Sequence, residues 1–567
     1  MPVSLTFSRP ATRPGRRLRD RVPVEVGAVG VVALALAVLM TWPAMAHPSR
    51  TVPGDFGDPL FFAWEIAWYG HALLSQIGHP FDANAYWPLP HTGVFSDTLL
   101  GLAPFGIGVS DMGDALVRYN VAYVLASAFA FAGAYLLARQ LGSGRIGALV
   151  AGAAFAFSPW RLSHAIHLNI LVSGAIPLSI ALLLRGNGIG RRGWFSGPAR
   201  PWLVVAAWAL AAWQLSLGFA IGLPALYLLI LVVTAGAVGW LRAGRPNLPR
   251  GLLIADLAGG AGFAAVTLAL GALFLRVAKE NPQVAESRSE RALAFFSPPV
   301  RAFWAAPDYS VVWGRLTAGA RAGLTWPIEM CLFPGLVVVL VAIAGLAVTT
   351  WRPRTRLLLL LGVAGTLVLA LGTTFLGGAV TWLPARHVLP GFEALRTPGR
   401  FVMYTVLLLG LLAAGALTRL AVRAGRFRHV LLVVPLLVCA EGLQAVPNPE
   451  VPPPPAAMSQ IRGPVLTLPD EQGQDGLSLI WSVGRFYPTV NGEASFTPEM
   501  MSEVIEVTKA FPEPYSIGYL RNMGVREVVV PRDRAAGTAF QNAVERPVDG
   551  LGVERRDLGD SVLYILR

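Results

Sequence analysis

The sequence predicts an α-helical polytopic membrane protein with about eleven transmembrane helices and a small external α/β domain at its C-terminal end. Three observations predict this architecture. Of the 567 residues, 54% are hydrophobic and only 14% are charged, which is typical of membrane proteins. The apolar residues gather in blocks close to the roughly 20 residues that a spanning helix needs. The arginines gather in short segments between these blocks.

The apolar blocks give the candidate spans in chain order. They are continuous, whereas the apolar residues of an amphipathic surface helix recur at intervals. Their odd number places the two ends of the chain on opposite sides of the membrane. The blocks cover residues 25–46, 117–138, 146–157, 166–184, 202–217, 221–241, 252–275, 332–350, 357–375, 402–420 and 430–445.

Arginine clusters set the orientation of these spans. The clusters all fall on one side and contain almost no acids, so the positive-inside rule makes that side cytoplasmic. They lie at residues 9–21, 139–145, 185–200, 242–250, 352–356 and 419–428. We therefore expect a cytoplasmic N-terminal segment, a transmembrane domain and three long external loops. The N-terminal segment covers residues 1–24 and the transmembrane domain covers residues 25–446. The three loops of this domain are residues 47–116, 276–329 and 377–401.

Two segments allow more than one interpretation. The N-terminal region resembles a cleaved secretory signal, because the basic segment 9–21 is followed by an apolar run and then by Ala44-Met45-Ala46. We favour a retained first span, because the apolar run is longer than the usual core of a signal. The block 98–109 is apolar but short, and Pro104 interrupts it. We expect it to be a re-entrant or surface-lying segment, because counting it as a span would place arginine clusters outside.

A proline-rich stretch at residues 447–455 predicts a linker to a separate external domain at 456–567. This domain carries no cluster of acids or histidines, so we expect it to contact substrate or regulate, and not to hold the catalytic centre. Its predicted strands and helices alternate, which favours an α/β fold. The predicted strands are 464–468, 525–530 and 561–566, and the predicted helices are 497–509 and 515–523.

The net charge of +13 does not indicate nucleic-acid binding, because the arginines flank apolar spans. Membrane lipids are the expected partners of these charges, and we expect no nucleic acid. Cys331 and Cys439 are too few for a disulfide framework or a thiolate metal site. A single bridge between them and two unpaired buried thiols are both open, and we favour the unpaired state.

Acids alternate with aromatic residues in the first external loop. Asp55 and Asp58 precede Trp64 and Trp68. Farther along the loop, Asp82 precedes Tyr86. Aromatic faces beside carboxylates are typical of sugar-binding sites, and an interfacial aromatic belt is the alternative interpretation. Asp58 followed by proline also fits a helix N-cap, a role compatible with catalysis.

Two further groups of polar residues lie on the predicted external side. Arg161, His164 and His167 follow the short third span, where they fit phosphate contact, metal binding or interfacial packing. A metal is not favoured, because the sequence identifies no third ligand. Arg396 and Arg400 precede a span on the side where the positive-inside rule disfavours them. Their planar donor forks match phosphate oxygens, of a substrate or of ordinary lipids.

Four segments together resemble the GT-C membrane glycosyltransferases, including uncharacterised YfhO-like bacterial proteins. The resemblance extends over nearly the whole chain, and it comes from the order of the segments and from their placement on one membrane face. The segments are Gly57-Asp58-Pro59-Leu60 with Trp64 and Trp68; Phe81-Asp82-Ala83-Asn84 with Tyr86; Arg161-Leu162-Ser163-His164 with His167; and Leu395 to Phe401.

The resemblance implies a multi-pass protein of the bacterial plasma membrane that transfers sugar from a polyprenyl-phosphate donor to an envelope acceptor on the external side. It also implies that an aspartate of the first external loop is the base, for which Asp58 is the first candidate and Asp55 the second. The substrate-binding candidates are Asp82, Trp64, Trp68, Tyr86, Arg161, His164, His167, Arg396 and Arg400. No cofactor follows from it, and a divalent metal is not favoured. The alternative is a non-enzymatic transporter or scaffold for envelope polymers, which the lack of evident inverted repeats disfavours.

Overall fold

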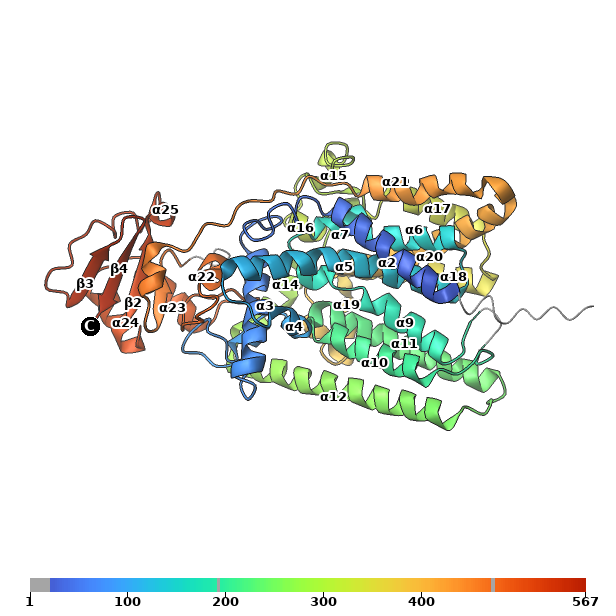
Figure 1. Cartoon of the computed structure of the whole chain (residues 1–567), viewed down its shortest axis with the longest axis horizontal. Coiled ribbons are helices and arrows are strands. Elements are labelled where there is room, and N and C mark those ends of the chain that lie inside the picture. Colours follow the sequence, from blue (N-terminus) through green and yellow to red (C-terminus); the bar gives the residue numbers. More distant parts are fainter. Residues whose placement is uncertain (1–20, 191–193, 471–474) are drawn as a thin grey trace, which may run out of the picture.

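The computed structural model describes residues 21–190, 194–470 and 475–567. A long bundle of helices carries the C-terminal domain at one end (Figure 1). The predicted arginine-rich segment 1–24 lies mostly outside the described residues. Cys331 and Cys439 are both buried free thiols.

Helices occur in all of the apolar blocks. Six helical segments of the described chain are long and apolar enough to cross a membrane, and shorter apolar helices accompany them. The chain is therefore a multi-pass membrane protein, while the number of crossings stays a prediction. The bundle helices are α2 (Arg21–Met40), α5 (Met112–Leu141), α6 (Arg145–Phe157), α8 (Leu168–Leu171), α9 (Ala175–Gly186), α10 (Pro201–Leu215), α11 (Phe219–Arg242), α12 (Arg250–Glu280), α17 (Leu336–Ala347), α18 (Pro353–Ala370), α20 (Val402–Ala424) and α21 (Val433–Glu441).

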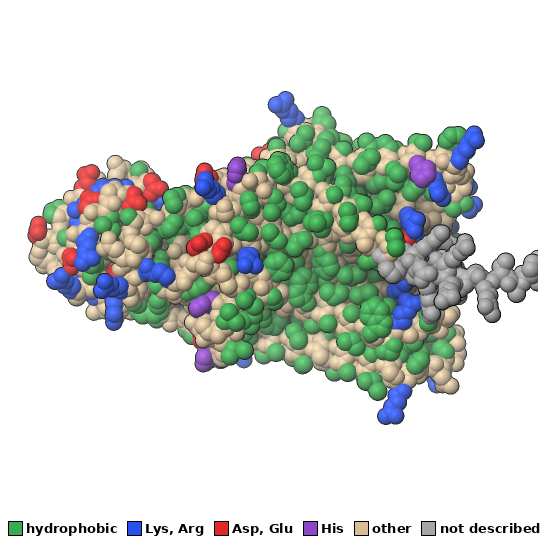
Figure 2. Space-filling model, viewed as in Figure 1, with side chains coloured by type: hydrophobic (Ala, Val, Ile, Leu, Met, Phe, Trp, Pro, Cys, Tyr) green, Lys and Arg blue, Asp and Glu red, His purple; other side chains and the backbone are tan. Residues whose placement is uncertain are grey.

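Small residues let the central helices approach each other closely. A Cβ added to Gly147 of α6 would lie 2.3 Å from the carbonyl oxygen of Ala414 in α20. Such close contacts are a common means of packing helices in a membrane. The lipid tails are as apolar as the helix surfaces, so the hydrophobic effect does not drive the helices together. In contrast, only 17% of the most apolar 18-residue stretch of α12 and 11% of that of α18 is buried within the protein. These two helices thus expose most of their apolar surface. Hydrophobic side chains cover the middle of the visible face, and charged ones gather toward its two ends (Figure 2).

Helix α3 (Asp58–Ser75) lies across the end of the bundle, next to the C-terminal domain (Figure 1). It packs on the short helix α4 (Ala103–Gly106), which belongs to the apolar block 98–109. A Cβ on Gly106 would lie 1.9 Å from the carbonyl oxygen of Ile66. Any side chain at position 106 would therefore push α3 away, and with it the first residue of α3, Asp58.

Short helices of the later loops cover the same end of the bundle. They bring residues far apart in the sequence next to α3. These elements are α13 (Gln283–Ser287), α14 (Glu290–Phe295), α16 (Pro327–Met330), α19 (Trp382–Val388) and η7 (Pro398–Phe401).

The C-terminal domain contains a four-stranded sheet in the order β1-β2-β4-β3. β1 (Val465–Thr467) pairs in parallel with β2 (Glu527–Pro531), and β4 (Ser561–Leu566) pairs antiparallel with β2 and with β3 (Val553–Asp557). Three of these strands and both predicted helices, α23 (Glu499–Thr508) and α24 (Pro514–Met523), agree with the sequence prediction. β3 was missed because it is a polar edge strand, and α22 (Gly476–Trp481) was missed as well.

Backbone hydrogen bonds join the C-terminal domain to the first long loop. The amide of Tyr86 donates to the carbonyl of Asn491 (3.1 Å), and the amide of Thr489 donates to the carbonyl of Asn84 (2.7 Å). The buried Asn84 side chain also donates to the Ser482 hydroxyl at 3.0 Å. The domain is thus fixed against the loop that carries Asp58.

Candidate functional site

One cavity of about 970 Å³ lies between α3, the N-terminal part of α11, the C-terminal half of α12 and the later loops. Its wall has two chemically different parts. Helices α11 and α12 supply an apolar part, which includes Phe219, Leu223 and Phe274. The loops supply a polar part, in which acids and arginines face each other. The polar residues of the lining include Asp58, Asp97, His167, Asn169, Arg288, Glu329, Arg386, Glu393, Arg396, Arg400, Glu493 and Ser495.

Asp58 is the first residue of α3, and the N-cap is Gly57. The alternative interpretation of Asp58 as the N-cap therefore does not hold, because Gly57 occupies that position. The carboxylate faces the cavity instead, where its Oδ2 lies 3.5 Å from Nε2 of His167. Pro59 at the start of the helix fixes the backbone without needing an amide partner, as proline commonly does there.

Glu329 and Arg400 form a buried ion pair beside Asp58. Nε of Arg400 donates to both carboxylate oxygens of Glu329 at 3.2 Å, and Nη2 donates to Oε1 as well. The Glu329 side chain is only 5% exposed, and its Oε1 also lies 3.9 Å from Nε2 of His167. His167 therefore stands between two carboxylates from different loops.

His164 forms a hydrogen bond with His167 on the side away from the cavity. Nδ1 of His164 and Nδ1 of His167 are 3.1 Å apart, so one imidazole donates to the other. His164 is fully buried, and burial lowers its pKa to about 3. It is therefore neutral at physiological pH, and its contact with His167 fixes the orientation of the second ring.

Opposing effects set the protonation of the two carboxyls. Burial raises the pKa of Asp58 above its usual value, although His167 and Arg400 oppose the shift. The side chain retains 38% exposure because it opens onto the cavity, while protein surrounds it elsewhere. Burial would also raise the pKa of Glu329, but Arg400 and the two histidines outweigh burial and hold it well below its usual range. Glu329 is thus a fixed anion, and Asp58 is the carboxyl suited to exchange a proton.

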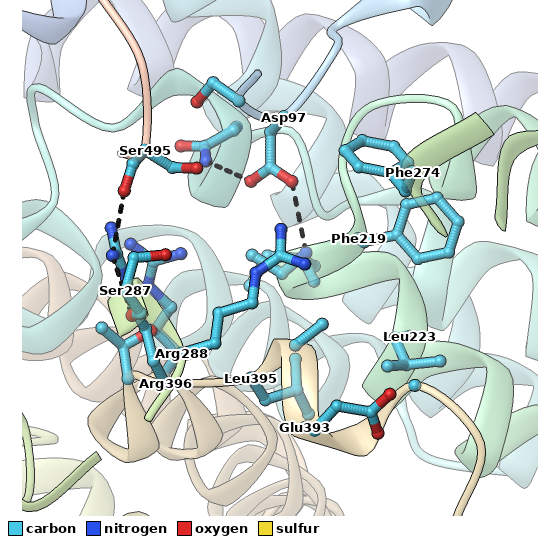
Figure 3. Close-up of a pocket in the computed structure, with 18 of the residues that line it drawn as sticks. Asp97, Phe219, Leu223, Phe274, Ser287, Arg288, Glu393, Leu395, Arg396 and Ser495 are labelled. Carbon is cyan, nitrogen blue, oxygen red and sulfur yellow. Dashed lines mark hydrogen bonds between the residues drawn. The ribbon is translucent and has the colours of Figure 1, made fainter. Parts of the chain in front are cut away.

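Asp97 is a second cavity carboxylate. Its Oδ2 accepts from Asn169 at 2.8 Å, and its Oδ1 accepts from the amide of Ala220 at 3.4 Å (Figure 3). It therefore closes the N-terminal end of α11, where an acid is favourable to the helix dipole. Buried Glu65 lies near both Asp58 and Asp97, and burial followed by these two charges raises its pKa well above the usual value.

Arg396 links three loops at the edge of the cavity. Nη1 donates to the carbonyls of Ser287 (3.2 Å) and Ser495 (3.1 Å) (Figure 3). The guanidinium also lies 5.6 Å from the ring centre of Phe296. Residues 493–495 of the C-terminal domain therefore form part of the cavity wall.

Of the residues predicted from the sequence, the structure brings Asp58, His167, Arg396 and Arg400 to this cavity, with His164 directly behind. The other candidates have different surroundings. Asp55 is exposed and accepts from the amide of Gly57 at 3.0 Å, and Asp82 accepts from the amide of His91 at 2.8 Å.

The predicted aromatic contacts and Arg161 do not line the cavity. Trp64 and Trp68 are buried and donate to the side chain of Asn84 and to the carbonyl of Pro80, each at 3.0 Å. Tyr86 is buried against the C-terminal domain. Arg161, 1% exposed, donates to Ser173 at 2.8 Å and to the carbonyl of Leu171. The two tryptophans thus bind within the first external loop, Tyr86 binds the C-terminal domain, and Arg161 binds residues just after it in the chain.

Three residues of the described chain have ligand atoms close enough to share a metal ion. His164, His167 and Glu329 each offer one atom, and these atoms all lie within 4.8 Å of one another. Glu329 is the third ligand that the sequence did not identify. However, the charge of Glu329 is already balanced by Arg400, so a cation at this position would compete with an existing ion pair.

Sequence reasoning missed Glu329, Asn169 and Arg288 as residues of this cavity. Glu329 is more than 270 residues from Asp58 and sits in a loop with no recognisable motif. One signal was available: an isolated acid within an apolar segment just before a predicted span is costly unless it is paired.

No family model and no curated protein sequence matches the chain. Comparison with solved structures finds the arabinofuranosyltransferase AftD from Mycobacteria, with a TM-score of 0.59 and 15% identity. The match covers 96% of this chain and 40% of that protein, so the chain spans less than half of its length.

Two other solved structures match at lower similarity. The archaeal oligosaccharyltransferase AglB from Archaeoglobus fulgidus, solved with an inhibitory peptide and a dolichol-phosphate, has a TM-score of 0.44 and 13% identity over 96% of this chain and 75% of that one. ArnT from Cupriavidus metallidurans has a TM-score of 0.35 and 16% identity over 97% of this chain and 98% of that one. The likeness to AftD shows that the chain shares the fold of this solved arabinofuranosyltransferase, in agreement with the fold expected from the sequence.

Proposed function

We propose that the protein is a membrane glycosyltransferase that moves a sugar from a polyprenyl-phosphate donor to an acceptor at the membrane face that carries the C-terminal domain. The observation that carries this proposal is the placement of Asp58. Its carboxylate opens onto a cavity of about 970 Å³ that joins a polar end to an apolar wall. A lipid-linked sugar has the same two-part character.

The proposed reaction uses Asp58 as general base. The acceptor hydroxyl oxygen attacks the anomeric carbon of the sugar, and its proton passes to the Asp58 carboxylate. The bond between the anomeric carbon and the phosphate oxygen breaks, and polyprenyl phosphate leaves with the bonding electrons. A phosphate leaves without being protonated by a second carboxylic acid, so one base is enough.

The other residues of the cavity support this chemistry. His167, oriented by His164, lies within 3.5 Å of Asp58 and helps to keep that carboxyl ionised. Arg396 and Arg400 add positive charge to the polar end of the cavity, which would favour the charge that develops on a leaving phosphate there. Residues 493–495 supply the part of the wall through which the C-terminal domain would contact a substrate.

Transfer by purified protein tests this proposal. We expect the protein in lipid nanodiscs to release free polyprenyl phosphate from at least one member of a panel of polyprenyl-phosphate sugars, and release should rise when envelope extract supplies acceptor. If no donor is turned over and the protein instead moves intact envelope polymer across vesicles, the transporter alternative holds and the proposal is wrong.

A further inference from the structure

The cavity contains four arginines, and they differ in what their donors already bind. Arg400 is paired with Glu329, and Arg396 donates to the carbonyls of Ser287 and Ser495. Arg386 donates to the carbonyl of Arg288 at 2.5 Å. Arg288 is different: within residues 21–190, 194–470 and 475–567, its guanidinium has no hydrogen bond and no ion pair.

The backbone that carries Arg288 is held by two of the other arginines. Arg396 binds the carbonyl of Ser287 and Arg386 binds the carbonyl of the next residue, Arg288 itself. These two contacts fix the short link between α13 and α14. A long side chain on a fixed backbone loses less freedom when it binds a ligand, so this position is preorganised.

The Arg288 side chain extends into the cavity, toward Asp97 and the apolar side chains of Phe219 and Leu223 (Figure 3). Burial lowers its pKa, while Asp97 and Glu393 oppose that shift. An arginine stays charged under all such conditions. The cavity thus presents an unused planar fork of donors at the border between its polar end and its apolar wall.

We propose that Arg288 is the residue that directly binds the anionic headgroup of a lipid, a phosphate ester next to an apolar chain. The inference rests on the proposed function and assigns the donor phosphate to a residue that the sequence did not indicate. Arg396 and Arg400 then act mainly by holding the loops and neutralising Glu329. A guanidinium fork binds phosphate oxygens in pairs, and Asp97 opposite it would keep the phosphate from moving deeper.

Binding of three probes to the full-length protein tests the inference. The probes are a polyprenyl monophosphate, the uncharged polyprenol of the same length, and inorganic phosphate. We expect Arg288→Gln to weaken binding of the polyprenyl monophosphate by about ten- to a hundredfold, the usual effect of losing hydrogen bonds to a charged group. Polyprenol binding should not change. Arg288→Lys should lie between, because lysine keeps the charge but lacks the fork.

Arg291→Gln is the matched control. It removes an arginine three residues away on the same loop, where the side chain is exposed. Its binding of all three probes should equal that of the wild type. Wild-type affinity of Arg288→Gln for the polyprenyl monophosphate would overturn the inference, as would an equal loss of polyprenol binding, which would indicate a collapsed cavity.

The probes also separate this inference from the proposed function. If the wild type binds inorganic phosphate through Arg288 but does not prefer the polyprenyl monophosphate, the anion site stands and the lipid donor is wrong. If the polyprenyl monophosphate binds equally well to the wild type, Arg288→Gln and Arg288→Lys, the lipid donor stands and the role of Arg288 is wrong.

Discussion

Nε2 of His167 lies 3.5 Å from Oδ2 of Asp58 and 3.9 Å from Oε1 of Glu329. Arg400 neutralises Glu329 but makes no such contact with Asp58. Both carboxyls face the same histidine, yet the pKa of Asp58 is raised by burial and the pKa of Glu329 is lowered, because Arg400 is paired with Glu329.

The acid limb of the pH profile should report Asp58. Because burial raises the pKa of Asp58, kcat/KM should fall as the pH drops toward a value above the usual one of about 4, where the base takes up a proton. The measurement is kcat/KM against pH for the wild type and for Asp58→Glu, in which the acid limb should move. An acid limb that is the same in both would contradict the assignment.

Removing Glu329 should destabilise the protein. Glu329→Gln leaves the Arg400 guanidinium buried without its counter-charge, which commonly costs about 3 to 5 kcal/mol. The low pKa of Glu329 means that this contribution is present at neutral pH and is lost only as strongly acidic pH protonates the carboxyl.

Thermal unfolding of the purified protein measures this effect. The control is Glu506→Gln, which removes the acid of an exposed pair with Lys509. The control should unfold as the wild type does, because exposed pairs contribute little. Equal unfolding temperatures for the wild type and Glu329→Gln would contradict a stabilising role for the buried pair.

Transfer should not depend on an added divalent metal. His164, His167 and Glu329 are close enough to share an ion, but Arg400 already balances the carboxylate. We expect activity to persist after treatment with EDTA and dialysis. Loss of activity that manganese or zinc restores would contradict this expectation and make these three residues the first ligands to replace.

The two ends of the chain should lie on opposite sides of the membrane. Reporter fusions after Arg245 and after Pro455 test this expectation, which rests on the arginine clusters. The first fusion should report the cytoplasm and the second the external side. A cytoplasmic signal from the second fusion would contradict the topology and would place the cavity on the wrong side for envelope substrates.

The helical bundle could be predicted from the sequence because continuous apolar blocks are a local signal. Each predicted span contains a helix, and the strands rich in β-branched residues were also found. β3, with the sequence Val-Glu-Arg-Arg-Asp, carries no such signal because its edge position lets polar side chains face water.

The site was only partly predictable, because it depends on contacts between distant loops. Asp58 and His167 have local motifs, whereas the pairing of Glu329 with Arg400 and the free guanidinium of Arg288 arise only once the loops are folded together. Trp64 and Trp68 were predicted to bind sugar because they alternate with acids in the sequence. The sequence does not reveal that their ring nitrogens bind the first loop itself.

Single-turnover transfer by Asp58→Asn tests the central claim most directly. The substitution keeps the size of the side chain and removes its ability to accept a proton, so transfer should slow by about 10²- to 10⁴-fold. Donor binding should be unchanged, and Asp55→Asn should transfer at the wild-type rate, because Asp55 is exposed and bonded to its own loop. A wild-type rate in Asp58→Asn, with folding and donor binding intact, would contradict Asp58 as the base.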